Sequence, residues 1–246
     1  MLHEPCACDG CGNQIGCALR DAGGAFPEDA DLAIRQEAFC ADAPIAVDGD
    51  CLLAVKSGVV KSVCRDAHGQ DRVVAFSFPG DLFGLEAAVD AEPADLRHGA
   101  CVSMTTVCRI RLRPEAAKRL PPQFCARLSA ELATRIRDNF QHRQLVADAA
   151  QVRMAHWLVQ LMRAARGRHQ GGAVSVLPAM ARADIASYLH LRVETVSRVL
   201  SEFRKNGWVR GPLHRLEVCD AQALDQLAQG QGALHPPVAA QGALHG

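Results

Sequence analysis

The sequence predicts an α+β fold, in which an antiparallel β-roll of the jelly-roll type is followed by a long helix and a C-terminal winged helix-turn-helix. Three observations lead to this fold class. Short apolar runs alternate with turn residues from about 26 to 113, apolar residues recur at helical spacing from 124 to 140, and two short helical patterns meet at a polar turn within 182–206. The first half of the chain is therefore β-rich and the second half helical.

Residues 1–25 form a cysteine-rich head, with Cys6, Cys8, Cys11 and Cys17 set among glycines and small polar residues. The head has no helical or strand period and too few apolar side chains to order itself by burial. The spacing Cys8-x2-Cys11-x5-Cys17 lets three thiolates converge on a soft metal, as three corners of an iron–sulfur cube or of tetrahedral zinc. Either needs a fourth ligand from elsewhere. The alternative is a flexible tail whose cysteines are incidental.

Residues 26–120 are expected to form the β-roll. Turn signals separate its strands at roughly ten-residue intervals, which is typical of an antiparallel sandwich or jelly roll. We interpret Cys40, Cys51, Cys64 and Cys101 as small core or half-buried side chains rather than metal ligands. The runs with strand character are 51–55, 58–63, 72–78, 100–104 and 106–112.

Residues 121–149 are expected to form one long helix after Pro121-Pro122. Apolar residues at four-residue spacing drift around a helix, so the stripe can face the roll at one end and a second helix further on. A long connecting helix is a natural two-fold interface, which predicts a homodimer of limited stability because polar residues interrupt the stripe. The alternative is a monomeric surface helix. The stripe consists of Phe124, Leu128, Leu132, Ile136 and Phe140.

Residues 150–228 contain the predicted helix-turn-helix, whose second helix opens at Val193 after a turn at His190 to Arg192. Its apolar stripe, at i, i+3, i+4 and i+7, is assigned to the core. The residues left outward at its N-terminal end suit double-stranded DNA, because an arginine can fork onto guanine and a glutamate can accept from cytosine. The alternative is an amphipathic helix pair with merely solvated charges. The core stripe is Val196, Val199, Leu200 and Phe203, and the DNA-facing candidates are Val193, Glu194, Thr195, Ser197 and Arg198.

Charge supports a nucleic-acid partner. Residues 150–219 contain 11 basic and 4 acidic residues, a net +7, whereas the remainder has 16 and 23, a net −7. A chain of zero net charge thus contains a basic segment, as a phosphate backbone requires. Residues 209–219 alternate around Gly211-Pro212 as the hairpin wing of a winged helix would. Residues 229–246 repeat Gln-Gly-Ala-Leu-His and are expected to be a disordered tail.

Composition excludes several classes of protein. An apolar fraction of 49% without a run near 18 apolar residues argues against a membrane partner. Met1 to Pro5 lack the features of a signal peptide, so a cytoplasmic location is expected, where the eleven cysteines are not expected to form a disulfide framework. No phosphate loop, zinc-protease helix or Ser-His-Asp arrangement is convincing, so neither an enzyme nor a catalytic residue is expected.

Residues 5–228 resemble the CRP/FNR superfamily of transcription regulators, and most closely its oxygen-sensing FNR branch. The resemblance rests on the order of the elements and on three motifs: the Cys-x2-Cys-x5-Cys head, Gly80-Asp-Leu-Phe-Gly84, and Glu194-Thr-Val-Ser-Arg198. It implies a homodimer that binds an inverted repeat of the TTGAT type and contacts RNA polymerase, through exposed loops such as Ala67 to Arg72. Cyclic nucleotide is not expected, because His98-Gly99 stands where nucleotide binders have an Arg-Ser pair.

The resemblance also implies a [4Fe-4S] cluster held by Cys8, Cys11, Cys17 and Cys108, with Cys101 as the competitor for the fourth position. Oxygen would convert the cluster toward [2Fe-2S], weaken the dimer and lower its DNA affinity. Gly12 gives the cluster no side-chain cover, which predicts a fast oxygen response. The alternatives are a regulator of the same fold with a thiol-disulfide or zinc switch, an iron–sulfur DNA-binding protein without a sensing role, and an enzyme bearing a regulatory β-roll.

Overall fold

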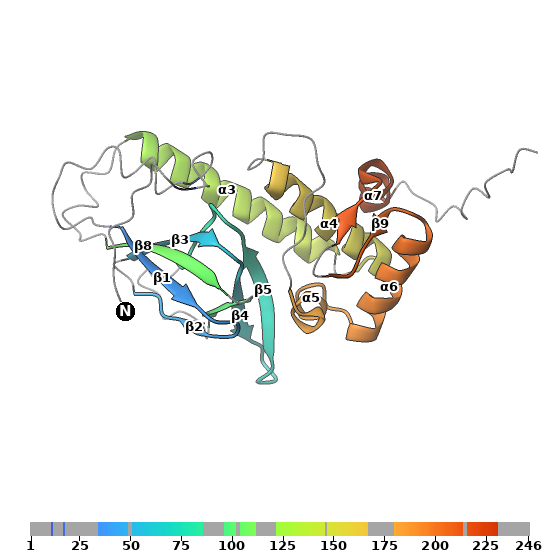
Figure 1. Cartoon of the computed structure of the whole chain (residues 1–246), viewed down its shortest axis with the longest axis horizontal. Helices are drawn as coiled ribbons and strands as arrows, with labels where there is room; N and C mark the ends of the chain where they lie inside the picture. The colour runs from blue at the N-terminus through green and yellow to red at the C-terminus, as the bar shows by residue number, and fades with distance from the viewer. Residues whose placement is uncertain are drawn as a thin grey trace, which may run out of the picture.

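The computed structural model describes most of the chain, and it has the α+β fold class predicted from the sequence. An antiparallel β-roll forms one lobe and a group of helices the other, and helix α3 runs along the roll toward α4 (Figure 1). Cys6, Cys8, Gly12 and the tail beyond Gly230 lie outside the described residues. In the described part of the chain, no helix is long and apolar enough to cross a membrane. The described residues are 11, 17, 34–48, 51–85, 96–101, 104–111, 122–145, 147–166, 180–213 and 216–230.

Two four-stranded antiparallel sheets make the roll, in the orders β1-β8-β3-β6 and β2-β7-β4-β5. Successive residues of a strand point to opposite faces, so the apolar side chains divide between two clusters. Leu53 and Val107 lie in the roll interior, whereas their chain neighbours Ala54 and Cys108 lie in an outer cluster next to α3. The strands are β1 (Arg35–Phe39), β2 (Pro44–Ile45), β3 (Cys51–Ser57), β4 (Val60–Arg65), β5 (Asp71–Ser77), β6 (Leu82–Phe83), β7 (Arg97–Ala100) and β8 (Thr105–Arg111).

Two expectations for the roll were wrong in detail. Of the described residues in the run 100–104, only Ala100 lies in a strand: β7 ends there, and Met104 is 73% exposed with φ 61°. The left-handed backbone at Met104 lets the chain reverse into β8. Cys40 is exposed and not in the core, because it follows the end of β1 in the turn toward β2.

Gly84 closes the Gly80-Asp-Leu-Phe-Gly84 motif in a conformation that requires glycine. Its φ is +74°, and a Cβ placed there would lie 2.6 Å from Cγ1 of Val47. A side chain at this position would therefore be strained and would collide with the neighbouring segment. The motif brings β6 back against β3, where Phe83 pairs with Leu53.

Helix α3 (Pro122–Leu145) starts on the roll and continues beyond it. Phe124 is completely buried in the outer cluster, and Leu128 packs against the same cluster. Further along, the apolar stripe is uncovered in the single chain: Leu132, Ile136 and Phe140 are 40%, 57% and 64% exposed. The outer cluster consists of Ile34, Leu52, Ala54, Leu82, Cys108, Ile110 and Phe124.

The C-terminal lobe is a winged helix-turn-helix, and its core cluster also takes in Val59 and Cys101 from the roll. The predicted stripe of the second helix is confirmed, since all four of its residues are buried. Helix α7, which the sequence did not lead us to expect, closes the lobe against α4; its first turn is capped by Asp220, which accepts a 2.9 Å hydrogen bond from the Ala223 amide. The elements are α4 (Ala150–Arg166), α5 (Arg182–Tyr188), α6 (Val193–Lys205), β9 (Val209–Arg210), β10 (Glu217–Val218) and α7 (Ala221–Ala228).

Candidate DNA interface and cysteine site

The outward face of α6 carries the five candidate DNA-binding residues. Glu194 and Arg198 are exposed, Val193 is 39% exposed, and Thr195 and Ser197 are half-buried. Neither Glu194 nor Arg198 forms an ion pair with another described residue, so both side chains are available to an external partner. Four hydrogen-bonding side chains and one apolar contact therefore lie near the start of one exposed helix, where base edges can be reached.

The turn before α6 is held from behind by α4. Arg153 Nη1 donates to the carbonyl oxygens of Leu189 and His190, at 3.0 and 3.1 Å. His190 has φ 53°, the left-handed conformation that the tight turn between the helices requires. Arg153 was not singled out from the sequence, because a charged residue on an amphipathic helix carries no signal of which distant carbonyls it will bind.

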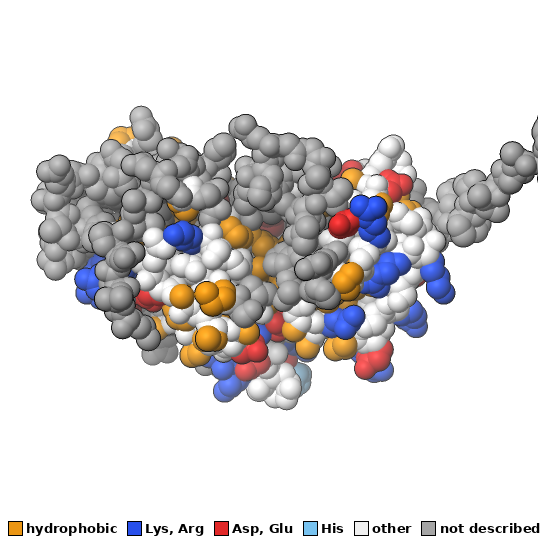
Figure 2. Space-filling view, in the orientation of Figure 1, with side chains coloured by type: hydrophobic (Ala, Val, Ile, Leu, Met, Phe, Trp, Pro, Cys, Tyr) orange, Lys and Arg blue, Asp and Glu red, His pale blue; other side chains and the backbone are white. Residues whose placement is uncertain are grey.

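The predicted wing is present as the antiparallel pair β9 and β10, in which Val218 pairs with Val209. The Arg204 side chain of α6 donates a 2.9 Å hydrogen bond to the Gly211 carbonyl, which ties the wing to the end of the helix. Lys and Arg side chains gather over this lobe in the space-filling view (Figure 2). Such a surface attracts the phosphate backbone on either side of the bases that α6 would read.

The comparisons with known proteins agree with this geometry. A sequence model of the Crp-like helix-turn-helix domain matches residues 152–227. The transcriptional activator protein Anr of Pseudomonas aeruginosa is 34% identical over 184 residues, which are 73% of this chain and 73% of Anr. This chain belongs to the CRP/FNR family. Members of the family are DNA-binding transcription regulators and not enzymes, and the similarity to Anr places this regulator in the FNR branch.

Other members of the family support the same assignment. The transcriptional activator protein FnrA of Stutzerimonas stutzeri is 31% identical to this CRP/FNR regulator, over 73% of each chain. The anaerobic regulatory protein of Haemophilus influenzae is 26% identical, over 72% of this chain and 68% of its own. The structure of FixK2 from Bradyrhizobium japonicum covers 80% of this chain and 98% of FixK2, with a TM-score of 0.66 and 27% sequence identity.

The two candidates for the fourth ligand of this CRP/FNR regulator, Cys108 and Cys101, lie in different environments. Cys108 on β8 is buried in the outer cluster, next to Ala54 of β3, and the half-buried Cys17 packs against the same cluster. Cys101 instead lies among the core residues of the C-terminal lobe, with its Sγ 3.5 Å from Asp184 Oδ2. The structure therefore places the head cysteine Cys17 against the apolar cluster that contains Cys108, and not against the cluster that contains Cys101.

The surroundings of Cys101 disfavour its thiolate form. Burial, with the Asp184 carboxylate nearby, raises the pKa of Cys101 to about 12. A thiol held protonated in this way is a poor metal ligand, because metals bind the thiolate. The residues that the structure describes contain no group of three His, Cys, Asp or Glu side chains placed to hold a metal; Cys11 is half-buried, and Cys8 lies outside them.

His98 is a buried polar residue of the roll. Its Nδ1 lies 2.9 Å from Ser62 Oγ, and its ring centroid is 5.4 Å from that of Phe83. This is the position where the resemblance places the arginine of cyclic-nucleotide binders. In this chain the position holds an aromatic and hydroxyl contact within an apolar core.

Proposed function

We propose that this protein is an oxygen-responsive transcription regulator that binds inverted-repeat DNA of the TTGAT type as a homodimer, while a [4Fe-4S] cluster is intact. The cluster would be held by Cys8, Cys11, Cys17 and Cys108. The observation that carries the proposal is that Cys17 and Cys108 share one apolar cluster with Phe124 of α3. Two of the four proposed ligands thus share an apolar cluster with the helix that would form the dimer.

When bound, a [4Fe-4S] cluster supplies an oxygen-sensitive link between the thiolates that hold it. Cys17 fits this role because it lies on the same apolar surface as Cys108, which limits access of water. Ala54, the cross-strand neighbour of Cys108, belongs to the same apolar cluster. A change at Cys108 is transmitted to α3 through Phe124, because tightly packed side chains move together.

The exposed stripe of α3 would form the dimer interface. Leu132, Ile136 and Phe140 are large apolar side chains that a second copy of the helix would cover. A two-fold axis along α3 would present two copies of α6 to an inverted repeat. In each copy, Arg198 would donate to a guanine and Glu194 would accept from a cytosine, with Ser197, Thr195 and Val193 contacting the neighbouring bases.

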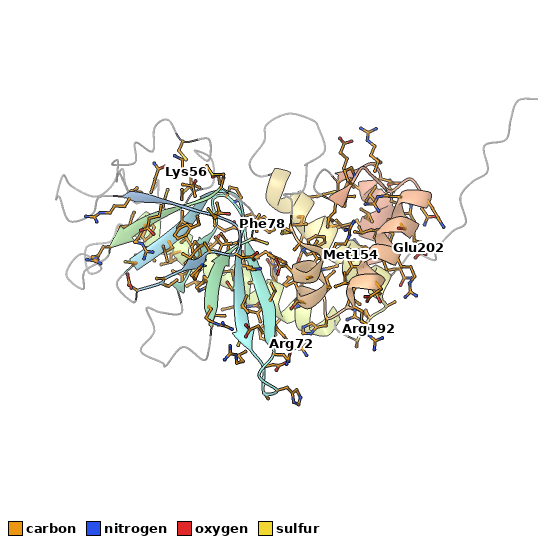
Figure 3. All side chains as sticks on the ribbon, turned by 60° about the horizontal axis from the view of Figure 1, so that its bottom comes forward. Lys56, Arg72, Phe78, Met154, Arg192 and Glu202 are labelled. Carbon is orange, nitrogen blue, oxygen red and sulfur yellow. The ribbon has the colours of Figure 1, made fainter. Side chains whose placement is uncertain are left out.

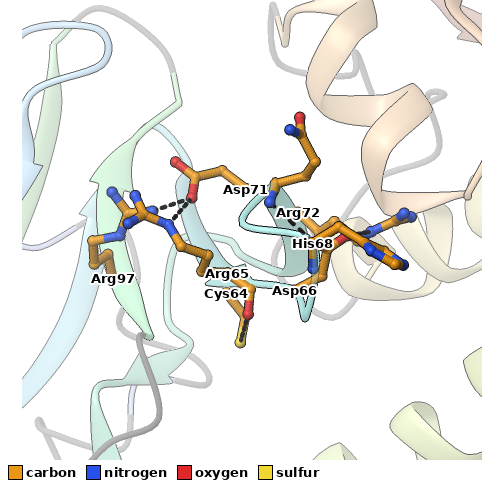
Figure 4. Close-up of polar contacts among 8 residues, drawn as sticks. Cys64, Arg65, Asp66, His68, Asp71, Arg72 and Arg97 are labelled. Atoms are coloured by element: carbon orange, nitrogen blue, oxygen red, sulfur yellow. Dashed lines mark hydrogen bonds and ion pairs between the residues drawn. The ribbon is translucent and has the colours of Figure 1, made fainter.

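RNA polymerase is the third partner in this proposal, and the β4–β5 hairpin is the surface for it. Asp66 accepts hydrogen bonds from the backbone of His68 and Gln70 and from Arg72, so the hairpin keeps a fixed shape (Figure 4). The hydrogen bond from Arg72, followed by that from the Gln70 amide, lowers the pKa of Asp66 to about 2. The carboxylate therefore stays ionised at neutral pH and the exposed tip stays ordered for contact.

The test is the visible absorption of protein purified without air, before and after air is admitted. A broad band that bleaches in air and is missing from Cys11→Ala and Cys108→Ala, but kept in Cys101→Ala, supports the proposal and its ligands. Cys101→Ala is the matched control because it removes an equally buried thiol. A colourless anaerobic protein would reject the cluster and favour a thiol-disulfide or zinc switch, which metal analysis would separate.

A further inference from the structure

Helix α5 is covered on both sides, although it is only two turns long. One face contributes Ile185 and Ala186 to the core of the C-terminal lobe. The other face lies on β5, the edge strand of the sheet β2-β7-β4-β5. Phe78 and Met154, from the two lobes, are drawn close to this boundary in Figure 3 and belong to one packed cluster. The DNA-reading lobe is thus docked onto the roll of its own chain.

The contacts across this boundary follow the spacing of one helix face. Asp184 Oδ1 and Oδ2 each lie 3.0 Å from Lys61 Nζ on β4. Three residues further on, Ser187 Oγ accepts a 3.0 Å hydrogen bond from the Val73 amide of the edge strand. One residue later, the Tyr188 ring lies 5.2 Å from the Phe76 ring. Because i, i+3 and i+4 share one face of a helix, the three contacts act together.

Lys61 and Asp184 form an ion pair across this boundary, where Arg72 Nη1 of β5 also lies 3.2 Å from His190 Nδ1. The side chains of the ion pair are only 16% and 14% exposed, and Lys61 also binds the exposed Asp42 at 2.8 Å. Burial acts to lower the pKa of Lys61, but its hydrogen bonds with Asp42 and Asp184 outweigh burial, so the pKa is raised and the ammonium stays charged. Cys101 donates to the same carboxylate. Removing either charge would leave the other in a partly desolvated site without its partner.

We propose that Lys61 and Asp184 are positioning residues for DNA binding. By holding α5 on β4 and β5, the pair fixes the direction of α6 relative to the roll and, in a dimer, the separation of the two recognition helices. Two half-sites must be met at one fixed spacing, so a domain that is free to swing binds a repeat less well. This inference rests on the two-fold DNA reading proposed above.

The experiment compares the wild-type protein with Lys61→Met and Asp184→Asn on three duplexes. One has two TTGAT half-sites at the preferred spacing, one has the spacing changed by a base pair or two, and one has a single half-site. We expect both variants to lose about tenfold or more on the repeat, to discriminate less between spacings, and to keep the wild-type affinity for the single half-site. A fold defect would instead lower all three affinities together.

Conservative and distant variants serve as controls. Lys61→Arg keeps the charge and should keep the spacing preference. Lys56→Met removes a lysine that binds Gln36 and lies at the far end of the roll from Arg72 in Figure 3, so it should behave as wild type. Unchanged spacing preference in both Lys61→Met and Asp184→Asn would overturn the proposal.

Hydrogen exchange of the Val73 amide separates docking from DNA reading, because that amide donates across the boundary in the free protein. Faster exchange in Lys61→Met and Asp184→Asn supports the pair as the element that holds α5, and unchanged exchange rejects it. If the wild-type protein binds the repeat no more tightly than the single half-site, the two-fold DNA reading is wrong and the positioning role is wrong with it. The exchange result would then still show separately whether the lobes are docked.

Discussion

Cys17 and Cys108 pack on one apolar cluster, although one belongs to the cysteine-rich head and the other to the last strand of the roll. The same cluster contains Phe124, the first buried residue of α3. A link between the two cysteines would therefore act directly on the N-terminal end of α3. Cys101, only seven positions before Cys108, faces the other lobe and contacts Asp184 instead.

Phe124→Ala should weaken the whole fold as well as the coupling to α3. Phe124 is fully buried, and truncating such a side chain costs about 3–5 kcal/mol through lost burial and the cavity left behind. Urea unfolding of the air-exposed protein, which the proposal expects to be mainly monomeric, measures this loss. Leu132→Ala, on the exposed part of the same helix, should change the unfolding free energy of the monomer by less than about 0.5 kcal/mol. Equal losses in both variants would contradict the assignment of Phe124 to the core.

Ile136→Glu should shift the protein toward the monomer. Ile136 is 57% exposed on α3, between Leu132 and Phe140, so a charge there would be buried against its symmetry mate. Sedimentation velocity over a range of protein concentrations measures the shift. Thr134→Glu adds the same charge at an exposed position on the opposite face of the helix and should leave the association constant unchanged. If Ile136→Glu leaves the monomer–dimer equilibrium unchanged, the dimer interface does not include this stripe.

Arg198→Ala should lower the affinity for the repeat and relax the choice of base at one position in each half-site. A good bidentate arginine–guanine contact contributes about 1–3 kcal/mol of discrimination against the wrong base. The exposed Arg192, just before α6, is the contrasting case: Arg192→Ala should weaken all sequences alike and reduce the salt dependence of binding. Binding measured on single-base variants of the repeat, at two salt concentrations, distinguishes the two patterns.

The sequence predicted the elements whose signals are local. The stripe of α6 and the alternation of β8 can be read from residue spacing, and both are present. Strands β1, β2 and β6 were not predicted. Strands β2 and β6 are only two residues long, and each exists through pairing with a distant strand. The run 100–104 has residues that favour strands, but the left-handed backbone at Met104 makes the turn into β8 there.

The candidate site was predictable in part for the same reason. Spacing alone suggested the DNA-facing residues, yet it could not decide between Cys101 and Cys108. The two cysteines are separated by the clusters in which they pack, and those clusters join residues far apart in the chain. The Lys61–Asp184 contact joins residues far apart in the chain, and Arg153 binds carbonyl groups of a different element. Neither leaves a local pattern in the sequence.

The junction between α3, α4 and α5 is rich in groups that can carry positive charge. His142 of α3 stacks on Tyr188 of α5, with ring centroids 4.2 Å apart, and lies 5.8 Å from the His190 ring. Arg153 and His156 of α4 line the same small pocket. Burial first, then the neighbouring His190, lowers the pKa of His142 below its usual 6.5, and burial with Arg72 and Arg153 lowers that of His190.

These shifts predict that acid weakens the junction, and His142→Gln tests it. Below pH 6.5 the unfolded chain binds a proton at His142 more readily than the folded chain does, so the unfolding free energy falls as the pH drops from 6.5 through the lower folded pKa. Above about pH 7 both states are neutral at this ring and its contribution is constant. Urea unfolding between about pH 5 and pH 8 should therefore show a shallower pH dependence in His142→Gln than in wild type. His68→Gln, at the exposed tip of the β4–β5 hairpin, is the control and should show the same pH dependence of the unfolding free energy as wild type. A wild-type pH dependence in His142→Gln would mean that other groups cause it.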